Sequence, residues 1–272
     1  MNTFGFIGCG NMGGALAGAV AKAVAGEQIV LCDASAEKAQ ALAKSLGARV
    51  KNAKDVASEC TYIFLGVKPQ GFAALFDEIR PILQSREDEF VLVSMAAGIT
   101  IGAVEQYAGK PCRVIRIMPN TPAAVGEGMI LYDANAWVSD DHLEIFRNAL
   151  SAAGRLDRLD EEKIDAASAL SGCGPAFVYL FAEALADGAV ECGLSREKAL
   201  LYASQTLAGA AKLLLTSGKH PGELKDAVCS PGGTTIAGVH ALEDGAFRAS
   251  VMSAVTAAYE KTLKLRQHRT NP

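Results

Sequence analysis

A glycine-rich turn near the N-terminus constrains the fold of this chain more than any other feature of its sequence. An apolar run over residues 3–7 reads as a strand, Gly8, Gly10 and Gly13 follow it in the spacing G-x-G-x-x-G, and the small residues of 14–24 read as a helix. Gly8 permits a tight turn, Gly10 permits close approach of a pyrophosphate, and Gly13 permits close packing of the helix on the strand. We therefore expect a dinucleotide-binding domain of the Rossmann type. The other residues of the turn, also expected beside the cofactor, are Cys9, Asn11 and Met12.

An acidic residue follows the second expected strand, 28–32. Asp33 stands about twenty positions beyond the glycines, where a carboxylate usually holds the 2′-hydroxyl of the adenosine ribose. In the alternative interpretation, Asp33 caps a helix over 36–46. Ser35 and Lys38 lie close behind and could instead meet a 2′-phosphate. The choice between NADH and NADPH therefore stays open.

Further apolar runs predict the remaining strands of a mostly parallel sheet of about eight strands. Ligands of such sheets bind at the carboxyl ends of the strands. The residues that follow three of these runs are therefore expected to line the cofactor. In chain order, the remaining strands are expected at 49–50, 62–67, 90–94, 114–118, within 126–138 and at 155–159, and the expected lining residues are Val67, Lys68, Pro69, Ala96, Ala97, Gly98 and Asn120.

The strand signals stop near residue 160, and helical stretches rich in small apolar residues follow. Helices that are apolar all round must be buried or covered by a partner. We expect an α/β nucleotide-binding domain with a doubly wound sheet over residues 1–160, followed by an all-helical dimerisation domain over 161–272. The expected helices are 164–192, 194–216, 221–228 and 247–267, the first of them kinked by Gly172, Gly174 and Pro175.

A hydroxyl-rich turn, Ser230 to Thr235, interrupts the helical half. A proline and two glycines exclude a helix interior there, and 236–242 reads as a helix. The turn therefore lies at a helix N-terminus, where the first N–H groups lack partners and the helix dipole is positive. Together with Ser230, Thr234 and Thr235, these N–H groups form a pocket for a small carboxylate. The alternative is an ordinary N-cap.

Composition excludes several other classes of protein. The chain has 272 residues, half of them hydrophobic, and a formal charge of −4, which offers no basic surface for nucleic acid or an anionic membrane. No apolar run is expected to reach membrane-spanning length. Seven scattered cysteines without C-x-x-C suit reduced thiols in a cytoplasm, and four scattered histidines argue against a metal site.

Six motifs occur in order along the chain: FIGCGNMG (6–13), LGVKPQ (65–70), SMAAGI (94–99), RIMPNTPA (116–123), LSGCGPAF (170–177) and LKDAVCSPGGTT (224–235). Together they resemble the pyrroline-5-carboxylate reductase family over essentially the full length. The resemblance implies reduction of the cyclic imine 1-pyrroline-5-carboxylate to L-proline, the last step of proline biosynthesis, by hydride from NADPH or NADH. It also implies a homodimer formed through the helical domain, and such dimers often assemble further into decamers.

The resemblance also assigns roles to residues. Gly8, Gly10 and Gly13 would take the pyrophosphate, and Asn120 and Pro122 would lie near the nicotinamide. The substrate carboxylate would be held by Ser230, Gly232, Gly233, Thr234 and Thr235, with the Thr235 hydroxyl near the ring nitrogen as the catalytic group. Asp33 departs from many NADPH-preferring relatives, which have a neutral or basic residue there, and its charge would repel a 2′-phosphate.

Two other functions compete with this interpretation. A β-hydroxyacid dehydrogenase with a helical C-terminal half typically carries a catalytic lysine on the interdomain helix, but this chain has no lysine between Lys163 and Lys198. A nucleotide-sensing protein would keep the glycine turn without needing the carboxylate pocket. Imine reduction needs a hydride and a proton that water or a hydroxyl can supply, so no catalytic histidine or aspartate is expected.

Overall fold

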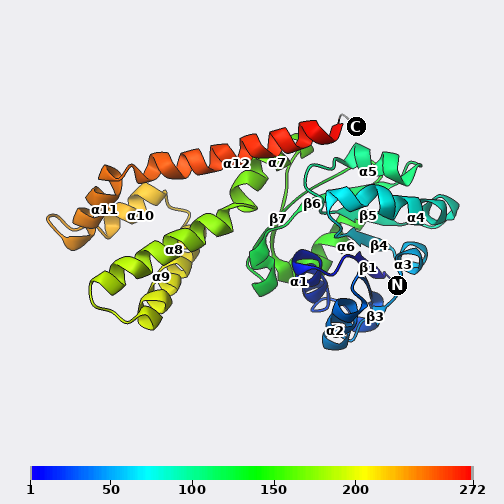
Figure 1. Ribbon diagram of the computed structural model, residues 1–272, viewed down its shortest axis with the longest axis horizontal. Coiled ribbons are helices and arrows are strands. Elements are labelled where there is room, and N and C mark those ends of the chain that lie inside the picture. Colours follow the sequence, from blue (N-terminus) through cyan, green and yellow to red (C-terminus); the bar gives the residue numbers. More distant parts are fainter. Residues whose placement is uncertain (1, 271–272) are drawn as a thin grey trace. The chain divides into compact units, whose positions relative to one another are not determined.

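The chain divides into two compact units in this computed structural model, which describes residues 2–270 and the side chains of 2–264 (Figure 1). The nucleotide-binding unit contains the described residues up to Cys173 and those from Tyr259 onward. The helical unit is Gly174–Ala258.

An eight-stranded sheet forms the centre of the nucleotide-binding unit, in the order β3-β2-β1-β4-β5-β6-β7-β8. Neighbouring strands from β3 to β6 are all parallel, β7 runs antiparallel to β6, and β8 is parallel to β7. The expected doubly wound sheet is thus confirmed. The strands are β1 (Phe4–Ile7), β2 (Ile29–Cys32), β3 (Arg49–Val50), β4 (Tyr62–Leu65), β5 (Val91–Ser94), β6 (Arg113–Met118), β7 (Gly128–Ala134) and β8 (Gly154–Arg158).

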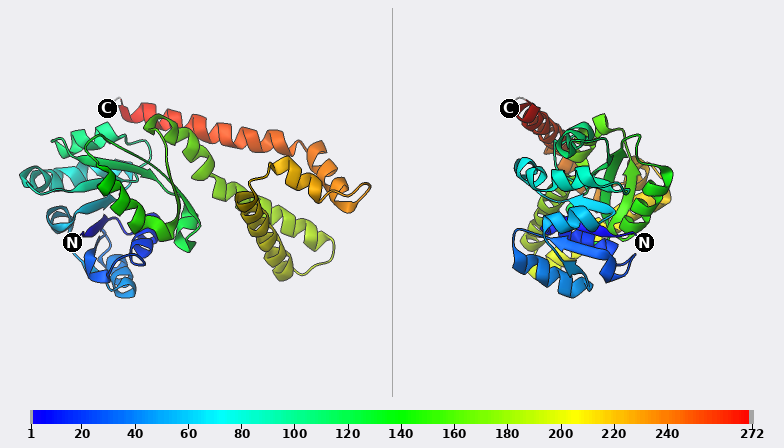
Figure 2. Two further views of the ribbon diagram at one scale, coloured as in Figure 1. Left: turned by 180° about the vertical axis from the view of Figure 1, so that it is seen from behind. Right: turned by 90° about the vertical axis from the view of Figure 1, so that its right-hand side faces the viewer.

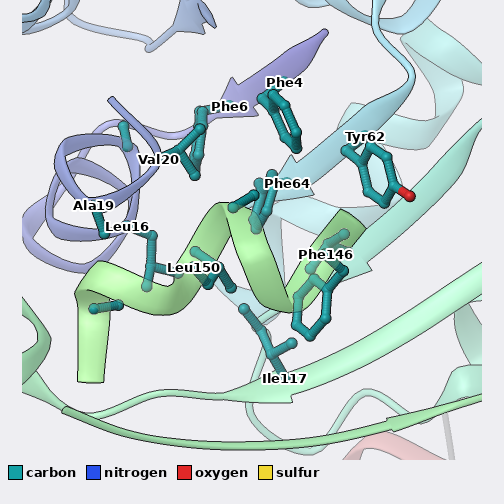
Figure 3. Close-up of a cluster of buried hydrophobic side chains, with 14 of the residues drawn as sticks. Phe4, Phe6, Leu16, Ala19, Val20, Tyr62, Phe64, Ile117, Phe146 and Leu150 are labelled. Atoms are coloured by element: carbon teal, nitrogen blue, oxygen red, sulfur yellow. The ribbon is translucent and has the colours of Figure 1, made fainter. Parts of the chain in front are cut away.

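Side chains of the buried strands alternate between two hydrophobic cores, one on each face of the sheet. Phe6 and Phe64 stack on one face with ring centroids 4.4 Å apart (Figure 3). Ile63 and Leu65 enter the opposite core. The first core is covered by α1 (Asn11–Val20), α2 (Ala36–Leu46) and α6 (Asp140–Leu150), and the second by α3 (Ala53–Glu59), α4 (Phe72–Ser85) and α5 (Ile101–Ala108). Helices on both faces hold β1, β2, β4, β5 and β6 between two apolar layers.

Several boundaries differ from the sequence expectation. Helix α1 begins at Asn11 rather than at residue 14, so the end of the glycine turn already belongs to the helix. Residues 126–138 contain one strand, β7, and short 3₁₀ helices occur at η1 (Gly26–Gln28), η2 (Pro69–Gly71), η3 (Thr121–Val125) and η4 (Ser151–Ala153). The expected kink coincides with a two-residue interruption at Gly172 and Cys173, which separates α7 (Glu161–Ser171) from α8 (Gly174–Glu191).

Residues 174–258 contain helices and no strand, as Figure 2 shows from two further directions. Helices α8 and α9 (Arg196–Ser217) pack against each other through Ala186, Ala199 and Ala203. They are followed by α10 (Pro221–Ala227), α11 (Thr234–Asp244) and the start of α12 (Phe247–Thr270). Within residues 174–191, Ala186 is the one buried side chain, so most of this apolar helix faces outward.

One apolar stretch is longer than the sequence led us to expect. Residues 161–191, which span α7 and α8, are long and apolar enough to cross a membrane by length and composition, because an 18-residue window within them has a mean hydropathy of 1.4. By that test, the expectation that no apolar run reaches membrane-spanning length was wrong. The helix break at residues 172–173 divides the stretch, and the exposed apolar residues of α8 belong to the helical unit.

Candidate functional site: a dinucleotide edge and a hydroxyl-rich loop

The expected cofactor residues follow β1, β2, β4, β5 and β6, which are parallel neighbours. Their carboxyl ends therefore meet at one edge of the sheet, with the order of connections reversing between β1 and β4. The structure brings to this edge the glycine turn, Asp33, the residues after Leu65 and Ser94, and the loop after Met118. Such a switch point is the usual ligand crevice of an open α/β sheet.

Two glycines of the turn are required by close backbone packing. Gly8 has φ +103°, and a Cβ atom there would lie 2.6 Å from the carbonyl oxygen of Gly66. A Cβ atom on Gly13 would lie 2.0 Å from the carbonyl oxygen of Gly8. Any side chain at either position would push the strand, the turn or α1 apart, which is the packing role the spacing predicts.

Gly10 has a different role, because a Cβ atom there would have no heavy atom of the described chain within 4 Å. The space above Gly10 is open, and Gly10 is the N-cap of α1, with no side-chain hydrogen bond from the described residues capping the helix. The first N–H groups of α1 and the positive end of its dipole thus face an open cradle. This arrangement fits the pyrophosphate of a dinucleotide.

Asp33 is tied to the glycine turn. Its Oδ2 accepts a 2.6 Å hydrogen bond from the backbone N–H of Cys9, and its Oδ1 accepts a 2.8 Å bond from the backbone N–H of Ser35. Ser35, not Asp33, is the N-cap of α2, because its hydroxyl oxygen accepts from the N–H of Lys38 at 3.5 Å. The helix-cap interpretation of Asp33 is therefore wrong. A carboxylate has about four acceptor positions, so a bond to a ribose stays a prediction.

The thiol next to this carboxylate stays neutral. Burial, and secondarily the charge of Asp33, raises the pKa of Cys9 to about 12. The Cys9 thiol donates a hydrogen bond to the carbonyl oxygen of Cys32 at 3.4 Å. Cys9 is therefore protonated at physiological pH, and it adds no negative charge where phosphates would bind.

A cavity of about 670 Å³ opens on the α1 and α2 side of the turn. Three of its lining residues, Cys9, Gly10 and Asn11, are among the expected cofactor residues, and Lys22 and Lys38 also line it. The lining also includes Ala123 and Ala124 of η3, after β6, but none of the expected cofactor residues that follow β4, β5 and β6. The cavity therefore reaches the open space above Gly10 but not the residues that follow β4 and β5.

The residues that follow β4 and β5 turn sharply at the cofactor edge. Pro69 is the first residue of η2, with Val67 and the exposed Lys68 before it. Ala96 is buried and Gly98 has φ +74°, a conformation that favours glycine. The expected close approach of a flat ring to residues 96–98 stays a prediction.

Asn120 points into the protein. Its Nδ2 donates to the carbonyl oxygen of Ser171 at 2.9 Å, and its Oδ1 accepts from the N–H of Met129 at 2.9 Å. Pro122 lies in the first turn of η3. Asn120 therefore lies at the expected edge, but its amide already serves two contacts within the chain.

The hydroxyl-rich loop of the helical unit lies at the start of α11, which begins at Thr234 rather than at Ile236. The N-cap is Gly233, with no capping bond from a described side chain, so the ordinary-cap interpretation of the serine and threonines is wrong. Gly232 has φ +65°, and the N–H of Gly233 donates to the carbonyl oxygen of Ser230 at 3.0 Å. Ser230, Thr234 and Thr235 are exposed at an uncapped helix N-terminus.

Known proteins resemble the chain over nearly its whole length. A family model described as pyrroline-5-carboxylate reductase dimerisation matches residues 161–265, and one described as NADP oxidoreductase, coenzyme F420-dependent, matches residues 3–98. The chain is 42% identical to pyrroline-5-carboxylate reductase of Arabidopsis thaliana, over 97% of this chain and 95% of that protein. The chain belongs to the pyrroline-5-carboxylate reductase family. It is 40% identical to the enzyme of that name from Escherichia coli (strain K12), over 96% of this chain and 97% of that protein.

A solved member of the family has the same fold. The structure of pyrroline carboxylate reductase from Plasmodium falciparum with NADP bound matches at a TM-score of 0.86 and 34% identity, covering 97% of this chain and 98% of that one. Membership confirms the expected oxidoreductase, its two-part fold and a nicotinamide dinucleotide cofactor, and it argues against the dehydrogenase and sensor interpretations. The individual site residues and the domain boundary at residue 160 stay predictions: the family match starts at 161, whereas α7 packs within the nucleotide-binding unit.

Sequence reasoning missed one cluster near this edge. Arg116, buried in β6, forms ion pairs with Glu161 (3.1 Å) and Asp165 (2.7 Å) of α7. An arginine between the apolar residues Ile115 and Ile117 was the available signal, because a buried guanidinium requires partners. Among the described residues, no group of three or more histidine, cysteine, aspartate or glutamate side chains could hold a metal ion.

Proposed function

We propose that this chain catalyses the NAD(P)H-dependent reduction of 1-pyrroline-5-carboxylate to L-proline. Family membership supports the reaction, and the glycine cradle supports the cofactor. The observation that carries the substrate assignment is the start of α11, where three exposed hydroxyl side chains surround a helix N-terminus without a side-chain cap among the described residues. Such a terminus suits a small carboxylate.

In this proposal the loop binds the substrate by its carboxylate. The N–H groups of the first turn of α11 and the hydroxyls of Ser230 and Thr234 donate to the carboxylate, while Gly232 and Gly233 keep the backbone accessible. The positive helix end favours the negative charge. Charge-assisted bonds of this kind orient the ring as well as hold it.

The reduced nicotinamide, when bound, supplies the hydride that the imine carbon accepts. The chain's own contribution is position: Thr235, the second residue of α11, places its hydroxyl at the ring nitrogen. The proton for that nitrogen comes from water or a hydroxyl, since no strong base is needed. Catalysis then arises mainly from holding the reacting atoms at near-attack distance.

Thr235→Ala should lower kcat/KM for the imine about tenfold or more, with the cofactor dissociation constant nearly unchanged. The change removes one hydroxyl hydrogen bond at the reacting nitrogen, about 1.5–3 kcal/mol if the nitrogen is charged. Steady-state kinetics with 1-pyrroline-5-carboxylate and a fluorescence titration of the cofactor measure the two quantities.

Two variants control that experiment. Thr235→Ser keeps the hydroxyl and should recover most of the activity. Thr216→Ala removes a hydroxyl that donates to the carbonyl oxygen of Lys212 at 2.9 Å on α9, and it should leave the kinetics unchanged. Wild-type kinetics in Thr235→Ala would show that the Thr235 hydroxyl does not contact the reacting nitrogen. A wild-type protein without imine-reducing activity would refute the proposed function.

Asp33 is proposed to set the cofactor preference. Its carboxylate lies at the glycine turn, and against NADPH it would meet a phosphate carrying nearly two negative charges. At an effective dielectric of 20 to 80 and several ångströms, this repulsion is roughly 1 kcal/mol or more. We propose that the enzyme uses both cofactors, and NADH relatively better than relatives without the acid.

Asp33→Ser should raise the ratio of kcat/KM for NADPH to that for NADH by about fivefold, which corresponds to roughly 1 kcal/mol. Because the variant also removes the acceptor of the Cys9 N–H, both absolute values should fall, and the ratio is the informative quantity. Glu37→Gln removes an exposed charge in the first turn of α2 and is the matched control. An unmoved ratio would mean that Asp33 only supports the turn.

We also propose that the enzyme is a homodimer formed through the helical unit, with decamers as a further assembly. The matched dimerisation model covers residues 161–265. In this unit an apolar cavity of about 550 Å³ is lined by residues of α8, α11 and α12, including Phe181 and Phe247. Leu180 and Leu215 are 68% and 73% exposed, an unusual amount of apolar surface for a stable monomer.

Leu180→Glu should raise the dimer dissociation constant by roughly 100-fold or more, because a charge would enter an apolar interface. Light scattering at micromolar concentration measures the mass of each protein. Trp137→Glu places the same charge at a residue that is 60% exposed in the nucleotide-binding unit and should leave the dimer intact. A well-folded wild-type monomer at that concentration would contradict the proposal.

The cellular location is proposed from the state of the cysteines. All seven cysteines are free thiols, which suits a reducing cytoplasm. We propose a cytoplasmic enzyme whose partners are its substrate, its cofactor and itself, without nucleic acid or membrane. A net charge of −4 supports the exclusion of nucleic acid.

A further inference from the structure

Helix α7 is held against the sheet near both ends by side chains from one strand and its following loop. At the first two turns, Arg116 of β6 pairs with Glu161 and Asp165. At the last turn, Asn120, two residues beyond the end of β6, donates to the carbonyl oxygen of Ser171 at 2.9 Å. These contacts all lie within the nucleotide-binding unit.

The orientation of the Asn120 amide is set by its partners. A backbone N–H, that of Met129, can only donate, and a backbone carbonyl, that of Ser171, can only accept. Exchanging the amide oxygen and nitrogen would place donor against donor and acceptor against acceptor. Asparagine satisfies both groups, whereas an ionised aspartate or an aliphatic residue cannot.

The Ser171 carbonyl needs this donor. The last four carbonyl groups of a helix have no partner within it. Many helices solve this with a left-handed residue at the end, but Gly172 is right-handed, with φ −75°. The side chain of Asn120, 51 positions away in the sequence, supplies a donor for the last residue of α7 instead.

We propose that Asn120 is a positioning residue for the reductase reaction rather than a ligand of the cofactor. It joins the Pro119–Pro122 loop to Met129 of β7 and to the end of α7, and so holds Pro122 at the cofactor edge. The inference rests on the proposed function for its kinetic effect. The contacts themselves can be tested without activity.

Asn120→Asp is the informative substitution. The carboxylate keeps an acceptor for the Met129 N–H but, when ionised, brings an oxygen against the Ser171 carbonyl. At neutral pH we expect kcat to fall at least about tenfold, which corresponds to about 1.4 kcal/mol. The cofactor dissociation constant should change by less than about threefold, because in this proposal Asn120 does not bind the cofactor. Hydrogen exchange of the Gly172 and Cys173 amides should quicken, because both donate to the Ser168 carbonyl in this turn.

The pH profile provides a rescue within the same variant. Protonation of the introduced carboxyl restores an O–H donor to Ser171. The activity of Asn120→Asp relative to wild type should therefore rise as the pH falls, which a change of bulk stability would not produce. Asn148→Asp makes the same chemical change on the exposed face of α6 and should show neither the loss nor the rescue.

Wild-type protein gives a test that needs no variant. If Asn120 bound the cofactor, saturating NADP⁺ would release the Met129 N–H and the end of α7, and exchange at Met129, Gly172 and Cys173 would quicken. The proposal expects unchanged or slower exchange. Faster exchange, or a tenfold rise of the cofactor dissociation constant in Asn120→Asp with unchanged exchange, would overturn it. Because exchange and cofactor binding do not require turnover, these outcomes remain interpretable even if imine reduction is absent.

Discussion

Gly13→Ala is expected to destabilise the nucleotide-binding unit and to abolish detectable cofactor binding. A Cβ atom at this position would lie 2.0 Å from the carbonyl oxygen of Gly8, a contact that the backbone must relieve by moving. Gly8 itself cannot yield easily, because it has φ +103° and packs against Gly66. We expect a loss of about 2 kcal/mol or more in the free energy of unfolding.

Gly10→Ala should separate binding from stability. No described heavy atom would lie within 4 Å of the added Cβ, so the free energy of unfolding should change by less than about 1 kcal/mol. The methyl group would nevertheless occupy the open cradle at the start of α1. We expect the cofactor dissociation constant to rise about tenfold or more, because the backbone can no longer approach the pyrophosphate closely.

Gly102→Ala is the control for both substitutions. It adds a methyl group to α5, where nothing described lies within 4 Å, and alanine favours a helix by about 1 kcal/mol. It should leave cofactor binding unchanged and stability equal or higher. Urea unfolding at one protein concentration and cofactor titration by fluorescence give both quantities. Equal cofactor affinity in Gly10→Ala and wild type would place the pyrophosphate elsewhere.

Arg116→Met should cost about 3–5 kcal/mol of stability, the usual result of removing one partner from a buried ion pair. Arg116 is 1% exposed, and its guanidinium bonds Asp165 at 2.7 Å and Glu161 at 3.1 Å. Glu161 also accepts from the N–H of Ile101 at 2.8 Å, so the loss should extend to the start of α5. Urea unfolding measures the cost.

Arg113→Met, in the same strand, is the matched control. Its partner Glu89 is 66% exposed, and exposed pairs contribute about 0–1 kcal/mol. The double substitution Arg116→Met with Asp165→Leu should recover part of the loss, since apolar replacement of a whole buried pair is often tolerated. A loss in Arg116→Met no larger than that in Arg113→Met would show that the network does not hold α7 to the sheet.

Most of the nucleotide-binding fold could be predicted because its signals are local. The continuous apolar residues of β4 and β5, and the glycines directly after β1, specify buried parallel strands and a dinucleotide turn within a few neighbouring positions. The hydroxyl-rich loop is equally local, because Pro231, Gly232 and Gly233 break the helix wherever the rest of the chain lies.

Contacts between distant positions were decided only by the tertiary structure. The sequence alone determined that Asp33, Asn120 and Thr234 lie beside a strand end or a helix start, since spacing and turn chemistry are readable from neighbours. It did not determine that the Asp33 carboxylate accepts a hydrogen bond from the Cys9 N–H, or that Arg116 pairs with Asp165. Nor did it determine that the Asn120 amide donates to the Ser171 carbonyl at the end of α7. Partners 24 to 51 positions apart meet through the packing of whole elements, and a polar group buried by that packing must bond whatever acceptor or donor it meets there.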